Sequence, residues 1–272
     1  MERRDILKNS LLTIGTLFSG SLASSSASGE SSPKAESSQS PANPWEYQIL
    51  DPIRTAEKAY HLYPDGSCMY ASFRAIVESV GEKTGEIDLQ KAQKFLSFPF
   101  GMMKYGKGGI YDYGTLCGAA NGCAAAVALF VSDTKMAKKI VDELFRFYET
   151  ESLPKYVPAE NSFHNLEKSV AGSVLCHLSL TQWRAESGAE ISSPRRKERC
   201  RRLTADITGF AVSLLNRWQK SSDANPCSFA EVSDSTKNCT KCHSPKGDQK
   251  DASTRMNCDS CHEDIDEKHP NK

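Results

Sequence analysis

The pattern Cys-x-x-Cys-His occurs twice near the C-terminus, and this repeat restricts what the last part of the chain can fold into. The first copy begins at Cys239 and the second at Cys258. Fifteen residues separate the two cysteine pairs, a spacing that also fits a zinc site with four cysteine ligands. Spacing alone therefore leaves two alternatives: one zinc ion held by four thiolates, or two haems, each attached through two thioether bonds.

The first 28 residues have the features of an export signal. Arg3 and Arg4 stand in a charged head, an apolar run follows from Leu11 to about Leu22, and small residues follow that run. The paired arginines resemble a twin-arginine signal, and the alternative is an ordinary secretory signal with a basic head. No later stretch reaches the ~18 apolar residues that a membrane helix needs. We expect a periplasmic mature protein with no membrane span.

Overall composition describes an ordinary globular protein. The chain has 272 residues, 39% of them hydrophobic and 25% charged. Its 34 basic residues balance 34 acidic ones. This charge balance provides no electrostatic footprint for a nucleic acid, so we expect no nucleic-acid partner.

Export favours haem over zinc at the two motifs. Covalent haem attachment takes place outside the bacterial cytoplasm, whereas exported cysteine pairs otherwise tend to form disulfides. A histidine follows each pair, and a zinc site with four thiolates needs neither. We therefore predict two haems c per chain. The attachment residues are Cys239, Cys242, Cys258 and Cys261, and the proximal iron ligands are His243 and His262.

Each haem iron has a sixth position, for which four histidines remain. In order of preference the candidate distal ligands are His61, His177, His164 and His269. His61 is expected to end a short amphipathic helix, and His177 directly follows Cys176. His164 is expected to precede a helix, where a capping role is the alternative, and His269 stands in a polar tail.

The length of the C-terminal part creates a packing problem. About 45 residues from Cys227 onward cannot cover two large apolar porphyrins. The haems must then lie against the preceding domain, against a second subunit or against each other.

The rest of the mature chain is expected to be all-α. Residues 29–45 are rich in Ser, Pro and Ala and predict a flexible leader, 46–226 a helical cysteine-rich domain, and 227–272 a loop-rich dihaem segment. Apolar spacings of three and four predict helices, with Ser193-Pro194 as the cap and first turn of the last. These helices cover 52–62, 68–81, 88–97, 115–133, 134–151, 166–183 and 194–219.

Six cysteines lie outside the repeated motifs, namely Cys68, Cys117, Cys123, Cys176, Cys200 and Cys227. They could be small buried hydrophobic residues or disulfides. Cys117 and Cys123 are six residues apart on one helical stretch and point in different directions, which argues against a shared ligand set. Because the twin-arginine route carries folded, often cofactor-loaded proteins, an iron–sulfur centre such as a 2Fe-2S cluster is a further candidate.

The dispersed cysteines carry a resemblance. The order Cys68, Gly122-Cys123-Ala124, Cys176, Cys200 resembles a family of redox-active proteins named for a Cys/Gly-Cys-Ala/Cys/Cys pattern. With two C-terminal Cys-x-x-Cys-His motifs, the chain is similar to the split-Soret cytochromes c of sulfate-reducing bacteria. The resemblance implies a homodimer whose bis-histidine haems form a four-haem cluster. It also implies that a distal histidine can come from the partner subunit, and it makes an iron–sulfur centre a candidate.

These features predict an exported dihaem electron carrier that exchanges electrons with redox partner proteins. One alternative is a haem enzyme that reduces a small oxyanion or peroxide at an open iron. Another is a thiol–disulfide relay, although none of the six remaining cysteines forms the Cys-x-x-Cys pair usual for that chemistry.

Overall fold

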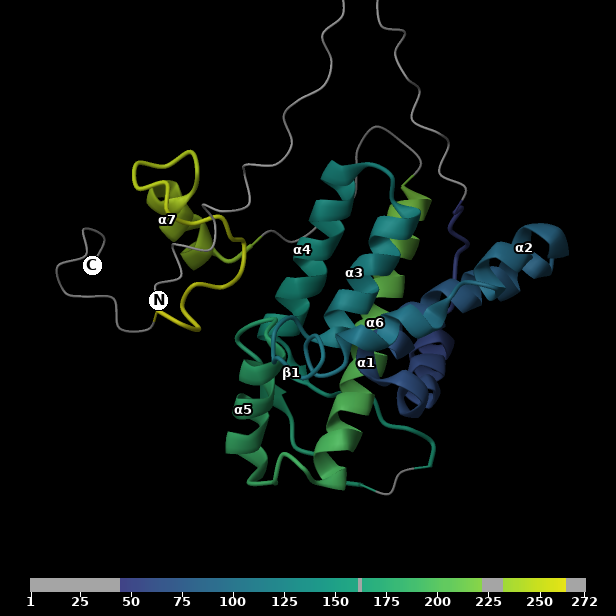
Figure 1. The fold of residues 1–272 in the computed structure, drawn as a ribbon, viewed down its shortest axis with the longest axis horizontal. Coiled ribbons are helices and arrows are strands. Elements are labelled where there is room, and N and C mark those ends of the chain that lie inside the picture. The colour runs from purple at the N-terminus through teal and green to yellow at the C-terminus, as the bar shows by residue number, and fades with distance from the viewer. Residues whose placement is uncertain (1–44, 161–162, 222–231, 263–272) are drawn as a thin grey trace, which may run out of the picture. The chain divides into compact units, whose positions relative to one another are not determined.

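The computed structural model describes residues 45–160, 163–221 and 232–262 (Figure 1). These residues are mostly helical, with one small two-stranded sheet, which confirms the all-α prediction. The elements in chain order are α1 (Pro52–Gly85), α2 (Leu89–Leu96), the 3-10 helix η1 (Phe100–Gly106), α3 (Gly118–Phe130), α4 (Thr134–Thr150), β1 (Ser152–Leu153), β2 (Ser169–Val170), α5 (Cys176–Ser187), α6 (Pro194–Lys220) and α7 (Asp234–His243).

Helix starts follow local capping chemistry. The Asp51 carboxylate accepts the Ile53 N–H at 2.8 Å and opens α1. The Ser193 hydroxyl accepts the Arg196 N–H at 3.2 Å and opens α6 directly before Pro194, as predicted. Such caps satisfy backbone donors that lack a partner in the first helical turn.

The break in α1 differs from its prediction. The sequence predicted that a first helix ends at His61, beside a Pro64-Asp65-Gly66 turn, but these residues continue the helical path. The backbone breaks instead at Ser67, which has φ 67° and ψ −169°. This conformation is essentially confined to glycine, so Ser67 stores strain directly before Cys68.

Helices α1, α3 and α6 contact one another and carry much of the core. On α3, Gly122 allows a close approach to α1, because a Cβ there would lie 2.2 Å from the Ser72 hydroxyl oxygen. The stretch 115–133 was predicted to be a buried helix rather than a membrane span, and α3 is indeed buried along most of its length. No helix in the described ranges is long and apolar enough to cross a membrane.

The helix predicted for residues 166–183 begins later in the structure, at Cys176. Residues 169–170 form β2, which pairs antiparallel with β1. Gly172 then takes φ +68° and turns the chain, and α5 starts only at Cys176. The apolar spacing of these residues predicted a helix, but residues 169–170 pair with β1 instead. The local sequence does not reveal this pairing.

The C-terminal segment (residues 232–262) contacts the helical domain (residues 45–221) through three successive residues. Asn257 donates from its side-chain amide to the Gly172 carbonyl at 3.0 Å. Arg255 forms an ion pair with Asp142 of α4, and Met256 packs against the core. The C-terminal segment is therefore fastened just before its second cysteine motif.

Candidate metal centres

Four cysteines from four separate helices come together inside the helical domain, and we call them the thiol cluster. Cys68 lies in α1 after the kink, Cys117 caps α3, Cys176 begins α5 and Cys200 lies in α6. The Cys68 and Cys117 thiols are within hydrogen-bonding reach, Cys68 interacts electrostatically with Cys176 and Cys200, and Cys176 interacts with Cys117 and Cys200. All are buried except Cys200, which is partly exposed.

Backbone hydrogen bonds hold two of these cysteines in register. The Cys117 N–H donates to the Val174 carbonyl at 2.9 Å, and the Cys176 N–H donates to the Thr115 carbonyl at 2.6 Å. These bonds frame an isolated antiparallel bridge at residues 116 and 175. The starts of α3 and α5 are thus fixed to each other, which places the two thiols on neighbouring segments.

Gly118 makes room for the thiol cluster. A Cβ at this position would lie 2.5 Å from the Cys68 sulfur and 2.6 Å from the Gly106 carbonyl oxygen. Real Cβ atoms do not approach other atoms that closely. The residue after Cys117 must therefore be glycine for Cys68 to occupy its place.

Burial and proximity change the acidity of the thiols. The hydrogen bond from Cys68 lowers the pKa of Cys117 to about 6, even though burial acts in the opposite direction. The pKa of Cys68 is raised by the same hydrogen bond and by burial. Burial also raises the pKa of Cys176 to about 12. Adjacent thiols cannot all ionise without a counter-charge, and a metal cation supplies one.

The polar surroundings of the thiol cluster suit an anionic group. The Tyr148 hydroxyl and the Arg199 Nε are both buried and have no hydrogen-bond partner. Both interact electrostatically with Cys117. Within the described residues no three His, Cys, Asp or Glu side chains are already arranged around a metal position. The cysteines are thus neighbours rather than a closed ligand shell, and their chemistry fits iron or an iron–sulfur group.

Cys123 has a different environment from the thiol cluster. Its sulfur lies 3.7 Å from the Ile207 carbonyl, and the Ser72 and Thr208 hydroxyls are close by. Burial raises its pKa to about 12. The resemblance had placed Cys123 in the dispersed pattern, but the residue beside Cys68 is Cys117. Cys227, another predicted candidate, lies outside the described residues.

The first haem motif stands on α7. Cys239 and Cys242 are three residues apart on a helix and therefore share a face. The His243 ring nitrogen Nδ1 lies 2.8 Å from a carboxylate oxygen of Asp251. A carboxylate at Nδ1 fixes the ring orientation and leaves Nε2 as the nitrogen for a metal.

The second haem motif forms a tight turn against the first. The Cys261 and His262 N–H groups donate to the Cys258 carbonyl at 3.1 and 3.0 Å. The Cys258 thiol lies near Cys239, and burial raises its pKa. Cys261 and His262 are exposed. The two motifs are therefore adjacent, as a pair of neighbouring haems requires.

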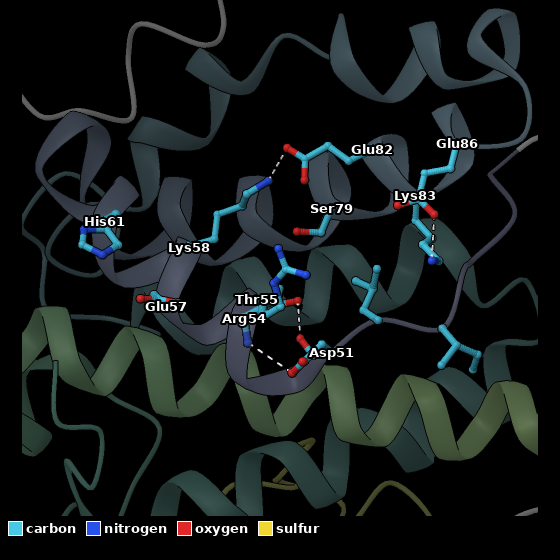
Figure 2. Close-up of a pocket in the computed structure, with 12 residues that line it drawn as sticks. Asp51, Arg54, Thr55, Glu57, Lys58, His61, Ser79, Glu82, Lys83 and Glu86 are labelled. Carbon is cyan, nitrogen blue, oxygen red and sulfur yellow. Dashed lines mark hydrogen bonds and ion pairs between the residues drawn. The ribbon is translucent and has the colours of Figure 1, made fainter. Parts of the chain in front are cut away.

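Figure 2 shows the first candidate distal ligand, His61, in a cleft of about 490 Å³. The cleft is bordered by charged side chains, and Lys58 forms an ion pair with Glu82 across it. His61 is exposed, with its ring edge against Tyr60. This lining offers little apolar surface for a porphyrin.

The other candidate distal ligands are placed differently. His177 is exposed at the start of α5, where its N–H donates to the Gly114 carbonyl at 3.0 Å. His164 is exposed and borders another cleft beside Tyr156. It precedes β2 rather than the predicted helix, so the capping interpretation is wrong. His269 lies outside the described residues.

The fold and these sites define a class of helical redox protein with buried thiols and paired haem-attachment motifs. The family model "Putative redox-active protein (C_GCAxxG_C_C)" matches residues 70–214, and the chain belongs to this family. It is 37% identical over 224 residues to the split-Soret cytochrome c of Desulfovibrio desulfuricans, covering 80% of this chain and 77% of that protein.

A solved structure of the split-Soret cytochrome c from the same organism is also similar. It is described as having a novel iron centre. The match has a TM-score of 0.72 and 36% identity, and it covers 80% of this chain and 90% of the other. These likenesses support a cytochrome that transfers electrons with a haem or iron cofactor.

Proposed function

We propose that this protein is an exported electron carrier with two covalent haems c and an additional iron centre held by the thiol cluster. The observation that carries the proposal is the convergence of Cys68, Cys117, Cys176 and Cys200 in a chain that also ends in two haem motifs. The iron centre described for the split-Soret relative supports it. When bound, these groups supply one-electron couples.

The residues have separate tasks in this proposal. Cys239, Cys242, Cys258 and Cys261 attach the haems, and His243 and His262 bind the two irons from the proximal side. Asp251 holds the His243 ring through Nδ1. The distal ligands come from His61, His177, His164 or His269. Of the two candidates that the sequence offered, Cys117 and Cys123, this proposal places Cys117 among the cluster ligands.

The predicted export signal and the family resemblance support the wider setting of the proposal. The protein reaches the periplasm by the twin-arginine route, which allows an iron centre to be loaded before export. It works as a homodimer, in which haems from two chains form a cluster, and exchanges electrons with redox partner proteins.

A matched pair of variants tests the iron centre. Cys117→Ala should remove non-haem iron and its paramagnetic resonance signal, whereas Cys123→Ala should retain both, because Cys123 faces Ile207 instead of Cys68. Total iron, haem iron and free thiols are measured on protein purified without oxygen. Equal loss in both variants contradicts the ligand assignment. A wild-type protein with about two iron atoms per chain, all in haem, contradicts the centre itself.

The mass of the mature chain tests the haems. We expect an increment of two covalently retained haems, and Cys239→Ala/Cys242→Ala should reduce this increment to one. A colourless protein, or one that contains zinc instead, overturns the cytochrome assignment.

A further inference from the structure

Arg199 is a buried cation with few partners. Its exposed fraction is 2%, and it lies on α6 directly before Cys200. The Nη2 group donates to the Ser179 hydroxyl at 2.7 Å and to the Ser179 carbonyl at 3.4 Å. The Nε–H has no hydrogen-bond partner. A buried guanidinium with an unused donor is costly unless something else compensates it.

Arg202, three residues further along the same helix, provides the comparison. It is also buried, but its Nε donates to the Glu198 carboxylate at 2.7 Å. In the described ranges no carboxylate pairs with Arg199. The groups that influence its charge are instead Cys200, Tyr148 and Cys117. Where Arg202 faces a carboxylate, Arg199 faces thiols.

Tyr148 completes this arrangement from α4. Its exposed fraction is 1%, and its hydroxyl has no hydrogen-bond partner. The hydroxyl lies near Cys117, Ser179 and Arg199. Two buried donors from different helices therefore lie close to Cys117, which leaves a positively polarised position beside its sulfur atom.

Breaking or omitting one partner of a buried ion pair costs several kcal/mol, on the order of 3–5. An arginine cannot avoid this cost by losing its proton, because it remains charged in proteins. The compensating negative charge must therefore come from the groups around it. Thiolates bound to iron carry that charge permanently.

We propose that Arg199, with Tyr148 as hydrogen-bond donor, compensates the charge of the iron centre and raises its reduction potential. The inference rests on the proposed iron centre. When bound, the centre would supply a one-electron couple, in which a haem iron would provide the electron by passing from ferrous to ferric without any bond being formed or broken. The added negative charge is stabilised by the fixed positive charge of Arg199 and by the Tyr148 hydroxyl. Arg199 would thus act on the iron centre through its charge and would not bind the metal itself.

The test is a redox titration of the purified holoprotein, with the iron centre followed by paramagnetic resonance and the haems by absorbance. At the midpoint potential of the wild-type centre, Arg199→Met should lower its reduced-to-oxidised ratio at least tenfold, which corresponds to 59 mV for a one-electron couple. Arg199→Lys should restore most of the ratio. Tyr148→Phe should shift it in the same direction by less.

Arg201→Met is the matched control. Arg201 also lies on α6, but its guanidinium stacks on Tyr60 at 3.7 Å from the ring centre. The Arg201→Met substitution removes the same net charge as Arg199→Met. Because Arg201 contacts Tyr60 rather than the thiol cluster, the potential of the centre should remain at the wild-type value. If Arg199→Met does not fold, Tyr148→Phe and Arg199→Lys are compared with wild type instead.

The possible results separate the two proposals. Unchanged potentials in a wild-type-like, iron-loaded Arg199→Met, or in Tyr148→Phe if the former does not fold, overturn the charge compensation alone. If Arg201→Met shifts the potential of the iron centre as much as Arg199→Met does, the charge compensation is also overturned. Absence of non-haem iron from the wild-type protein overturns the iron centre and with it this inference.

Discussion

The helical domain and the C-terminal segment build their candidate sites in opposite ways. In the helical domain, α1, α3 and α6 bury many apolar side chains, and the thiol cluster lies among them. In residues 232–262 no apolar side chain is fully buried, although Met256 reaches the core of the other region. The first region has a hydrophobic core of its own, whereas the second needs its prosthetic groups to supply one.

The solvent exposure of the cysteines also differs between the helical domain and the C-terminal segment. Cys68, Cys117 and Cys176 are buried, whereas the haem-motif cysteines are partly or fully exposed. Exposed thiols suit covalent attachment by another enzyme after export, and buried thiols suit a centre that must be kept from water and oxidants. The exposure of a cysteine thus separates the proposed iron centre from the proposed haem-attachment sites.

The largest expected effect comes from removing haem attachment. Replacing all four motif cysteines by alanine should leave amides 232–262 exchanging as in an unfolded chain, while amides of α1 and α6 remain protected. The reason is that only the helical domain has a core without haem. Hydrogen exchange with mass spectrometry measures both regions in one sample. Continued protection of the C-terminal segment would remove the contrast between the regions.

A second substitution tests the close packing of Gly118 against Cys68 in the helical domain. Gly118→Ala forces a methyl group against the Cys68 sulfur and the Gly106 carbonyl oxygen, and we expect it to cost about 1–3 kcal/mol of unfolding free energy and to deplete non-haem iron. Gly101→Ala is the control, because nothing lies within 4 Å of its added Cβ. Denaturant unfolding measures both. Equal midpoints for the two variants would contradict the close approach.

The pH dependence of unfolding should also map to the helical domain. Burial raises the pKa of Asp206 from 3.8 to about 6, although its carboxylate accepts the Lys155 and Tyr156 N–H groups at 2.7 and 2.9 Å. The folded state then holds the proton more tightly, so stability falls as the pH rises from about 4 to 6 and levels off above.

Asp206→Asn should remove this dependence. Its stability relative to wild type should rise over that interval, on the order of 3 kcal/mol. Unfolding curves at several pH values measure the difference. A difference that is constant with pH would show that Asp206 ionises normally in the folded protein.

The smallest expected effect concerns the kink before Cys68. Ser67→Gly should stabilise the helical domain by about 1 kcal/mol, because glycine adopts this backbone conformation without strain. Ser79→Gly, in a regular part of the same helix, should instead destabilise it by about 1 kcal/mol. Thermal unfolding compares the two. A loss of stability in both would mean that Ser67 is not strained.

Much of the helical domain could be predicted from local signals. Apolar spacing located α2 and α4, apolar spacing with the Ser193-Pro194 cap located α6, and a run of strong helix formers located α3. The start of α5 could not be found, because the pairing of Ser169 with Leu153 depends on residues 16 positions apart. The helical path through Pro64 was missed because Ser67, rather than Gly66, takes the unusual backbone conformation.

The sequence indicated that cysteines would form the site, but it did not indicate which of the six cysteines would come together. The sequence indicated that Cys117 and Cys123 point apart, yet the resemblance favoured Cys123. A partial signal for Cys117 was available: Ala119 is followed three residues later by Gly122, as in the family name, although Cys117 and Gly118 stand in the reverse order of its Gly-Cys pair, whereas Val127 stands three residues after Ala124. The roles of Arg199 and Tyr148 could not be predicted, since only tertiary packing brings them to the thiols.

The attachment of the C-terminal segment through Arg255, Met256 and Asn257 has a consequence for chain length. Because Cys258 comes directly after these contacts, a haem at the second motif has almost no tether between itself and α4. Any insertion between Asn257 and Cys258 would loosen it, whereas the loop from Ser244 to Thr254 can lengthen at Ser253, which lies outside the contacts that Asp251 and Ala252 make with His243. Relatives that keep the same spacing of redox groups should therefore differ in that loop and not at the junction.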